Sequence, residues 1–96
     1  MAEQFDWNPE KSASLLARHG VSFEDVVIAF QDGRLLAELD HPGETFAHQR
    51  IAVVRINDYA YAVPYVMDGD VRFLKTLYPS RKLQKSYLSN PDDNDR

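Results

Sequence analysis

RIAVVRINDYAYAVPYVMDGDVRFLKTL, residues 50–77, carries the strongest structural pattern in the chain. β-Branched and aromatic residues dominate it and two short polar pairs interrupt it, which is typical of strands joined by tight turns. An Asp-Gly pair is a strong hairpin signal because both central residues of the favoured turn need positive φ. We therefore predict an antiparallel meander with strands at 50–56, 59–67 and 71–77, and turns at Asn57-Asp58 and Asp68-Gly69.

The segments next to this meander are less regular. Pro64 cannot donate a ladder hydrogen bond, so we expect an edge or a bulge in its strand. Residues 34–39 suit a further strand, and Pro42-Gly43 marks residues 40–45 as a loop. The sheet is thus predicted to have three or four strands.

Two helices are predicted before the sheet. Asn8-Pro9 is a helix start and Gly20 a helix end, because Asn caps free N–H groups, Pro suits the first turn and Gly adopts a left-handed C-terminal conformation. Ser22 with Asp25 resembles a capping box that opens the second helix. The clearest helical spacing in the chain follows it, at Phe23, Val26, Val27 and Phe30.

After the meander, Pro79-Ser80 breaks the last strand, and Ser80 is read as the N-cap of a short basic helix at 81–88. The predicted fold is α+β: a β-like start, two N-terminal helices, a three- to four-stranded antiparallel sheet and a short C-terminal helix. One domain is expected over residues 4–88. Residues 89–96 are predicted to be a disordered acidic tail.

Composition restricts the functional classes. A chain of 96 residues is long enough for one core and too short for two. Cysteine is absent, which excludes disulfides and thiolate metal sites. No segment approaches the roughly 20 apolar residues of a membrane span, and no signal peptide is evident, so a cytoplasmic protein without a membrane partner is expected.

Charge is distributed unevenly. Residues 1–70 carry 5 Lys and Arg against 12 Asp and Glu, a balance of −7, whereas residues 71–91 carry five cations and no acid. A solvated face explains this asymmetry as well as a surface for a polyanion does. The basic segment also contains two tyrosines, and cations combined with aromatic rings are typical of single-stranded RNA binding. The set is Arg72, Lys75, Tyr78, Arg81, Lys82, Lys85 and Tyr87.

No cofactor or metal site is predicted. The three histidines lack ligand spacing, and the chain has no Gly-rich phosphate loop and no nucleophile elbow. Trp7 is favoured as a lid on the core over a base-stacking residue. RNA cleavage without a cofactor needs only a proton acceptor, a cation beside the phosphate and an acid for the leaving oxygen.

Three blocks, F-D-W-N-P-E-K at 5–11, R-H-G-V-S-F-E-D at 18–25 and L-K-T-L-Y-P-S-R-K at 74–82, resemble the BrnT family of toxins from type II toxin–antitoxin systems. The resemblance covers about residues 5 to 88. It implies a RelE-like fold, a translation-inhibiting endoribonuclease and a neutralising antitoxin, commonly a ribbon-helix-helix protein through which any DNA contact would be indirect.

The resemblance also implies site residues. The paired basic residues after the last strand correspond to Arg81 and Lys82, the strand arginine to Arg50 or Arg55, and either Lys75 or Tyr78 is expected in proton transfer. The predicted catalytic set is Arg50, Lys75, Tyr78, Arg81 and Lys82. The predicted RNA-binding set is Trp7, Arg55, Arg72, Lys85 and Tyr87.

Two departures from the family pattern favour an alternative function. The usual Ser-Ala-Arg end of the last strand is replaced by Tyr78-Pro79-Ser80-Arg81, and the chain is acidic where such toxins are often basic. The alternative is a degenerate toxin, a non-catalytic module that binds its antitoxin and takes part in regulating transcription.

Overall fold

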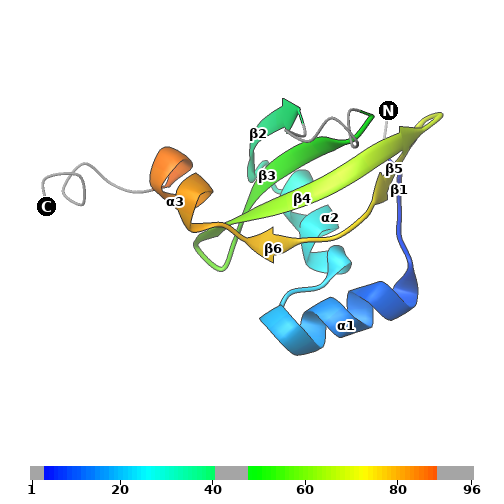
Figure 1. Ribbon diagram of the computed structural model, residues 1–96, viewed down its shortest axis with the longest axis horizontal. Coiled ribbons are helices and arrows are strands. Elements are labelled where there is room, and N and C mark those ends of the chain that lie inside the picture. Colours follow the sequence, from blue (N-terminus) through cyan, green and yellow to red (C-terminus); the bar gives the residue numbers. More distant parts are fainter. Residues whose placement is uncertain (1–3, 41–47, 89–96) are drawn as a thin grey trace, which may run out of the picture.

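The computed structural model describes residues 4–40 and 48–88, which form an α+β fold of helices packed against a six-stranded, mostly antiparallel sheet (Figure 1). The strand order is β1-β5-β4-β3-β2, and β6 lies beside β4. The elements in chain order are β1 (Gln4–Asp6), α1 (Pro9–His19), α2 (Phe23–Gln31), β2 (Leu35–Asp40), β3 (Arg50–Ile56), β4 (Tyr59–Asp68), β5 (Val71–Leu74), β6 (Tyr78–Pro79) and α3 (Arg81–Tyr87).

The predicted meander is confirmed, but its two turns differ from each other. Asn57 and Asp58 both have positive φ, at 54° and 63°, so the tight turn that needs two such residues joins β3 to β4. At the second hairpin Asp68 still pairs with Val71, and the turn residues are Gly69 and Asp70. Only Gly69 has positive φ there, which corrects the reading of Asp68-Gly69 as the central pair.

Pro64 lies in a central strand, which contradicts the predicted edge or bulge. β4 is flanked by β3 and β5, and its pairing with β3 runs without a register shift through Pro64. The Pro64 carbonyl accepts a hydrogen bond from the Lys75 N–H at 2.9 Å. Because N and C=O of one strand residue face the same side, the missing N–H of Pro64 faces the gap where β5 has ended and β6 has not begun.

The predicted last strand, 71–77, is wrong in extent, since β5 ends at Leu74 and the chain pairs with β4 again only at Tyr78. Leu74 and Leu77 are both 1% exposed and both belong to the core. Residues an odd number apart on one strand point to opposite faces. The chain must therefore leave the strand between them.

The sheet is larger than the three or four strands predicted, because short segments at both ends of the chain join it. β1 pairs parallel with β5, with Phe5 opposite Arg72, and so confirms a β-like start. β6 adds two residues beside β4.

Helix α1 begins and ends as predicted, and α2 begins as predicted. The Asn8 side chain accepts hydrogen bonds from the N–H groups of Glu10 and Lys11, and Gly20 ends α1 with φ of 73°. The Ser22 N–H donates to Asp25 Oδ2 at 2.9 Å. These contacts are local, which is why the sequence reveals them.

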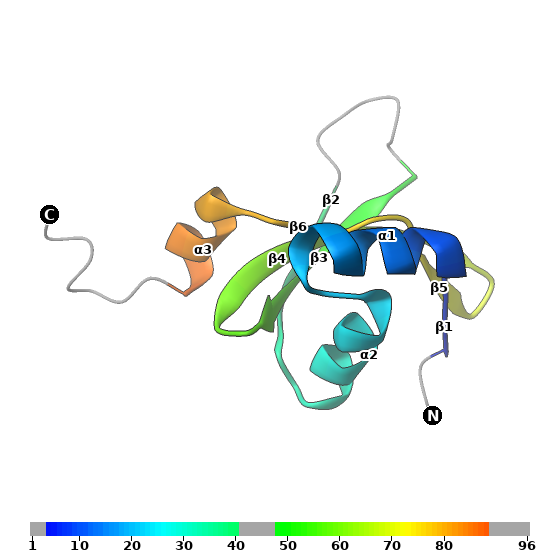
Figure 2. The same ribbon diagram turned by 90° about the horizontal axis from the view of Figure 1, so that it is seen from below.

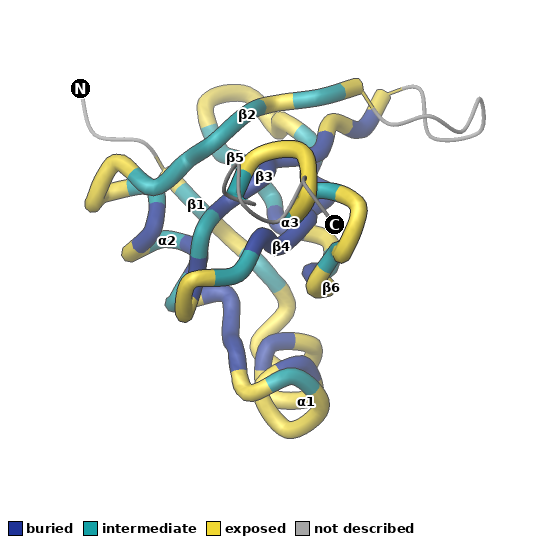
Figure 3. The backbone as a smooth tube through the Cα atoms, turned by 90° about the vertical axis from the view of Figure 1, so that its left-hand side faces the viewer, coloured by how far each residue is buried: buried dark blue, intermediate teal, exposed yellow. Residues whose placement is uncertain are grey.

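Helices α1 and α2 cover one face of the sheet, and α3 lies beyond its end (Figure 2). The core between helices and sheet contains Leu15, Phe23, Val26 and Val63, all at most 1% exposed. The tube in Figure 3 is dark blue along much of β3 and β4 and mainly yellow along α3, which has no buried residue.

Some predictions fall outside the described residues: the acidic tail at 89–96 and all of the 40–45 loop except Asp40, which ends β2. Within 4–40 and 48–88, no helix is long and apolar enough to cross a membrane.

Candidate functional site

The basic helix α3 is fixed to the sheet by polar contacts. Ser80 Oγ accepts the Leu83 N–H at 3.2 Å, which confirms Ser80 as the N-cap. The Ser80 N–H donates to the Ala60 carbonyl at 3.0 Å, and the Ala60 N–H donates to Gln84 Oε1 at 2.8 Å. Gln84 thus takes the place of a strand partner for Ala60, and α3 cannot rotate without breaking this bond.

A groove of about 320 Å³ opens between α3 and the sheet, and we call it the α3 groove. Ala62, in its floor, lies between Tyr61 and Val63, which belong to the core. Because alternate strand residues point to opposite faces, the groove lies on the face away from α1 and α2. Its lining residues are Leu39, Asp40, Ile51, Ala62, Tyr78, Ser80, Lys82 and Leu83.

The predicted residues around this groove are accessible. Arg81 and Lys82 are exposed, and in the described part of the chain neither forms an ion pair. Tyr78 is 42% exposed and Tyr87 40%. Helix α3 has no acidic residue in its first turn, and Lys85 lies in its last turn. Tyr78 and Lys82 therefore share one groove, whereas Arg81, which precedes Lys82 in α3, does not line it.

The other predicted catalytic residues lie apart from this group. Lys75 is exposed with its Nζ 5.4 Å from the centre of the Phe73 ring, and it does not line the groove. Arg50 lies opposite Tyr65, a core residue, and so on the helix-bearing face. Its guanidinium lies 3.2 Å from Asp40 Oδ1, so Arg50 is linked to the α3 groove only through Asp40.

Two of the predicted RNA-binding arginines form ion pairs, one at the surface and one largely buried. Arg55 forms an ion pair with Asp58 at 3.5 Å. Arg72, whose side chain is 12% exposed, lies 3.6 Å from Glu38. Its guanidinium carbon is 4.6 Å from the Phe30 ring centre and 4.7 Å from that of Tyr65, distances typical of cation–π contacts.

Sequence reasoning missed the polar group around Arg72, which we call the Glu38 cluster: Glu38, Tyr65 and Arg72. The Tyr65 hydroxyl donates to Glu38 Oε1. Burial first, and then this hydrogen bond, raise the pKa of Tyr65 above its ordinary value of 10.0. β3 and β4 separate β2 from β5, so only the three-dimensional register brings these side chains together. The sequence gives one indication of this cluster: Glu38 is an acidic residue in the otherwise apolar segment 35–39.

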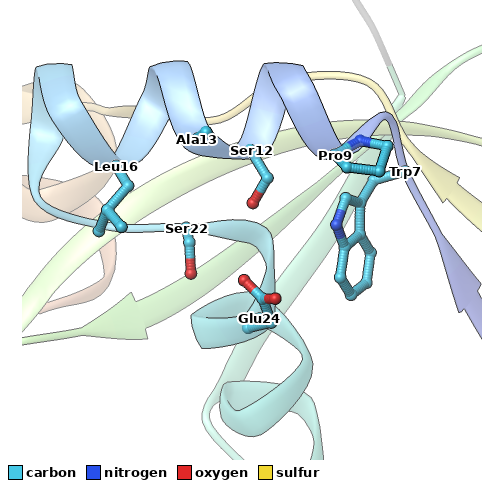
Figure 4. A pocket seen from close by; sticks show the side chains of 7 residues that line it. All are labelled: Trp7, Pro9, Ser12, Ala13, Leu16, Ser22 and Glu24. Carbon is cyan, nitrogen blue, oxygen red and sulfur yellow. The ribbon is translucent and has the colours of Figure 1, made fainter.

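A second hollow lies between the first two helices, and we call it the α1–α2 pocket (Figure 4). Trp7 borders it and packs against Phe23, with ring centres 5.9 Å apart. This packing agrees with the expectation that Trp7 covers the core. The pocket measures about 220 Å³ and is lined by Trp7, Pro9, Ser12, Ala13, Leu16, Ser22 and Glu24.

Comparison with known proteins adds no family assignment: no protein-family model matches the chain, and no curated protein matches it. In the described ranges no group of three or more His, Asp or Glu side chains is placed to hold a metal ion.

Proposed function

We propose that this protein is the toxin of a type II toxin–antitoxin system, an endoribonuclease that works without metal or cofactor and inhibits translation by cleaving RNA. The observation that carries the proposal is the α3 groove, where Tyr78 and Lys82 line one hollow beside Arg81. The resemblance of three sequence blocks to BrnT toxins supports the same function and extends the α+β fold to a RelE-like one.

The chemistry follows from the groups at the groove. Cleavage transfers a proton from the 2′-hydroxyl, builds charge on the phosphate and delivers a proton to the leaving oxygen. Arg81 and Lys82 form no ion pair among the described residues, so they are suited to stabilise the phosphate. Tyr78 lines the groove and Lys75 does not, which favours Tyr78 for proton transfer.

A second candidate is the non-catalytic module that binds an antitoxin. It is favoured by the ion pairs of three arginines: Arg50, Arg55 and Arg72 each pair with an acidic residue of the same chain. An arginine that must leave such a partner to reach a phosphate is less suited to catalysis than an arginine without one. Partner binding does not need these arginines to be available.

Induction of the protein in a bacterial host, followed by growth and RNA integrity, tests the proposal. We expect growth arrest and RNA fragmentation. The double variant Arg81→Ala/Lys82→Ala should relieve both effects, whereas Lys11→Ala/Arg18→Ala, which removes two exposed charges from α1, should not. Growth that continues although folded protein accumulates, with intact RNA, favours the non-catalytic module.

A further inference from the structure

The α1–α2 pocket combines one aromatic face, one carboxylate and apolar walls. In Figure 4 the Glu24 carboxylate lies between the Trp7 indole and the Ser22 hydroxyl, and Leu16 stands at the opposite end from Trp7. Leu16 is 50% exposed. Among the described residues no hydrogen bond or ion pair of the Glu24 side chain is found. The carboxylate is therefore available to a ligand.

The indole of Trp7 is held in place before any ligand arrives. One side of it packs against Phe23, which is 0% exposed, at an interplanar angle of 43°. Buried Ser12 fixes the helices on either side, since its Oγ accepts the Phe23 N–H at 3.1 Å. A rigid aromatic surface costs little entropy when it binds, because its side chain is already ordered.

The electrostatic sign of the pocket is negative. The N-termini of α1 and α2 both border it, and each contributes about half a positive charge. Asn8 and Asp25 already cap N–H groups of these ends. Glu24 is the one charged residue among those that line the pocket, and the Asp25 carboxylate offsets the positive end of α2.

Size and chemistry select the ligand. At about 220 Å³ the pocket is smaller than the roughly 300–1,000 Å³ of small-molecule sites, so it suits a single side chain. A planar guanidinium stacks on an indole and pairs with a carboxylate through two N–H groups, which a lysine ammonium does not do. The carbon stem of an arginine suits the apolar wall at Leu16.

From this complementarity we infer that the α1–α2 pocket receives an arginine side chain of a partner polypeptide. The guanidinium lies on Trp7 and pairs with Glu24. The inference is independent of the proposed RNA function, because the pocket lies on the helix-bearing face and the α3 groove on the other. Both surfaces can be occupied at once.

Trp7 is the only tryptophan, so its fluorescence reports on this pocket alone. The probes are the acetylated and amidated tripeptide Gly-Arg-Gly and the same tripeptide with neutral citrulline in place of arginine. We expect a saturable change in Trp7 emission with the arginine peptide and about tenfold weaker binding of the citrulline peptide. No saturable change, or equal binding of the two peptides, overturns the inference.

Glu24→Gln provides a second test that keeps the size of the side chain. It should weaken the arginine peptide about tenfold, whereas Glu10→Gln, which does not line the pocket, should change its affinity less than about twofold. Circular dichroism verifies that each variant is folded. If Glu24→Gln binds as well as the parent protein, the inference is wrong; if it does not fold, the citrulline comparison on the parent protein still decides.

Discussion

At the scale of single residues, the most informative side chain is Arg72. Its position in the basic segment predicts a surface cation, yet it lies beside Glu38 with aromatic rings around it. Arg72 lies two residues before Leu74 in the predicted strand, so the sequence places both side chains on the same face of the sheet, the core side. It does not show that Glu38, three strands away in the sheet, reaches the same point. The strand register therefore decides that Arg72 is largely buried.

The Glu38 cluster makes stability depend on alkaline pH. The pKa of Tyr65 is raised in the folded protein, so the native state holds this proton more tightly than the unfolded state. The protonated Tyr65 hydroxyl therefore contributes to the free energy of unfolding. This contribution is fully present below pH 10.0, the ordinary tyrosine pKa, and is lost as the pH rises toward the raised pKa of the folded protein.

Denaturant unfolding at several pH values above 9 measures this effect. We expect Tyr65→Phe to lose stability less steeply with pH than the parent protein, although it starts from a lower stability because Glu38 loses the hydroxyl donor. Parallel pH profiles of the two proteins would contradict the role given to this hydroxyl.

At the scale of elements, local sequence signals predicted where helices begin and end, whereas the pairing of strands distant in the sequence could not be predicted. Both ends of α1 follow from Asn8 and Gly20, and the start of α2 follows from the Ser22–Asp25 pair, since each of these contacts joins residues a few positions apart. A β-like start was predicted, but its parallel pairing with β5, 67 residues later in the chain, was not, because no local pattern reveals so distant a partner. The end of β5 at Leu74 could have been predicted, because two core leucines three residues apart, Leu74 and Leu77, cannot lie on the same face of one strand.

The aromatic positions of α2 contribute unequally to the core. The helical spacing assigns Phe23 and Phe30 to the same stripe, but Phe23 is 0% exposed and Phe30 only packs against the edge of the core, next to Phe5 and Arg72. Phe23→Ala should cost about 3–5 kcal/mol of unfolding free energy, and Phe30→Ala clearly less. Equal losses in chemical denaturation would show that the two positions are equally packed.

Helix α3 depends on one hydrogen bond more than on apolar packing. Gln84→Ala leaves the N–H of Ala60, a 0% exposed residue, without its acceptor, at a cost of about 1–3 kcal/mol. We expect faster hydrogen exchange at Ala60 and a weaker affinity for single-stranded RNA. Gln31→Ala, an exposed change at the end of α2, is the matched control and should alter neither. Unchanged exchange at Ala60 would disprove the anchoring role.

At the scale of the whole molecule, the two faces differ in charge and in chemistry. The helix-bearing face has an aromatic pocket with one carboxylate, and the other face has the α3 groove beside the basic helix α3, with both Asp40 and Lys82 in its lining. An acidic inhibitor segment is attracted by the same cations as RNA.

The basic helix should therefore affect how an antitoxin binds. We predict that Lys82→Glu with Lys85→Glu slows association with the antitoxin and flattens its dependence on salt, because electrostatic attraction acts mainly on the association rate. Stopped-flow mixing at several ionic strengths measures both quantities. An unchanged association rate would place the antitoxin elsewhere, for instance on the first two helices.

Cleavage of a labelled single-stranded RNA by the purified protein in the presence of a metal chelator would show whether the α3 groove acts on RNA. We expect cleavage that the chelator does not affect. Arg81→Ala and Lys82→Ala should each lower the rate about tenfold or more, with melting temperatures nearly unchanged, since exposed charges contribute under about 1 kcal/mol to stability. RNA that stays intact, or cleavage that neither substitution slows, would show that the α3 groove is not a ribonuclease site.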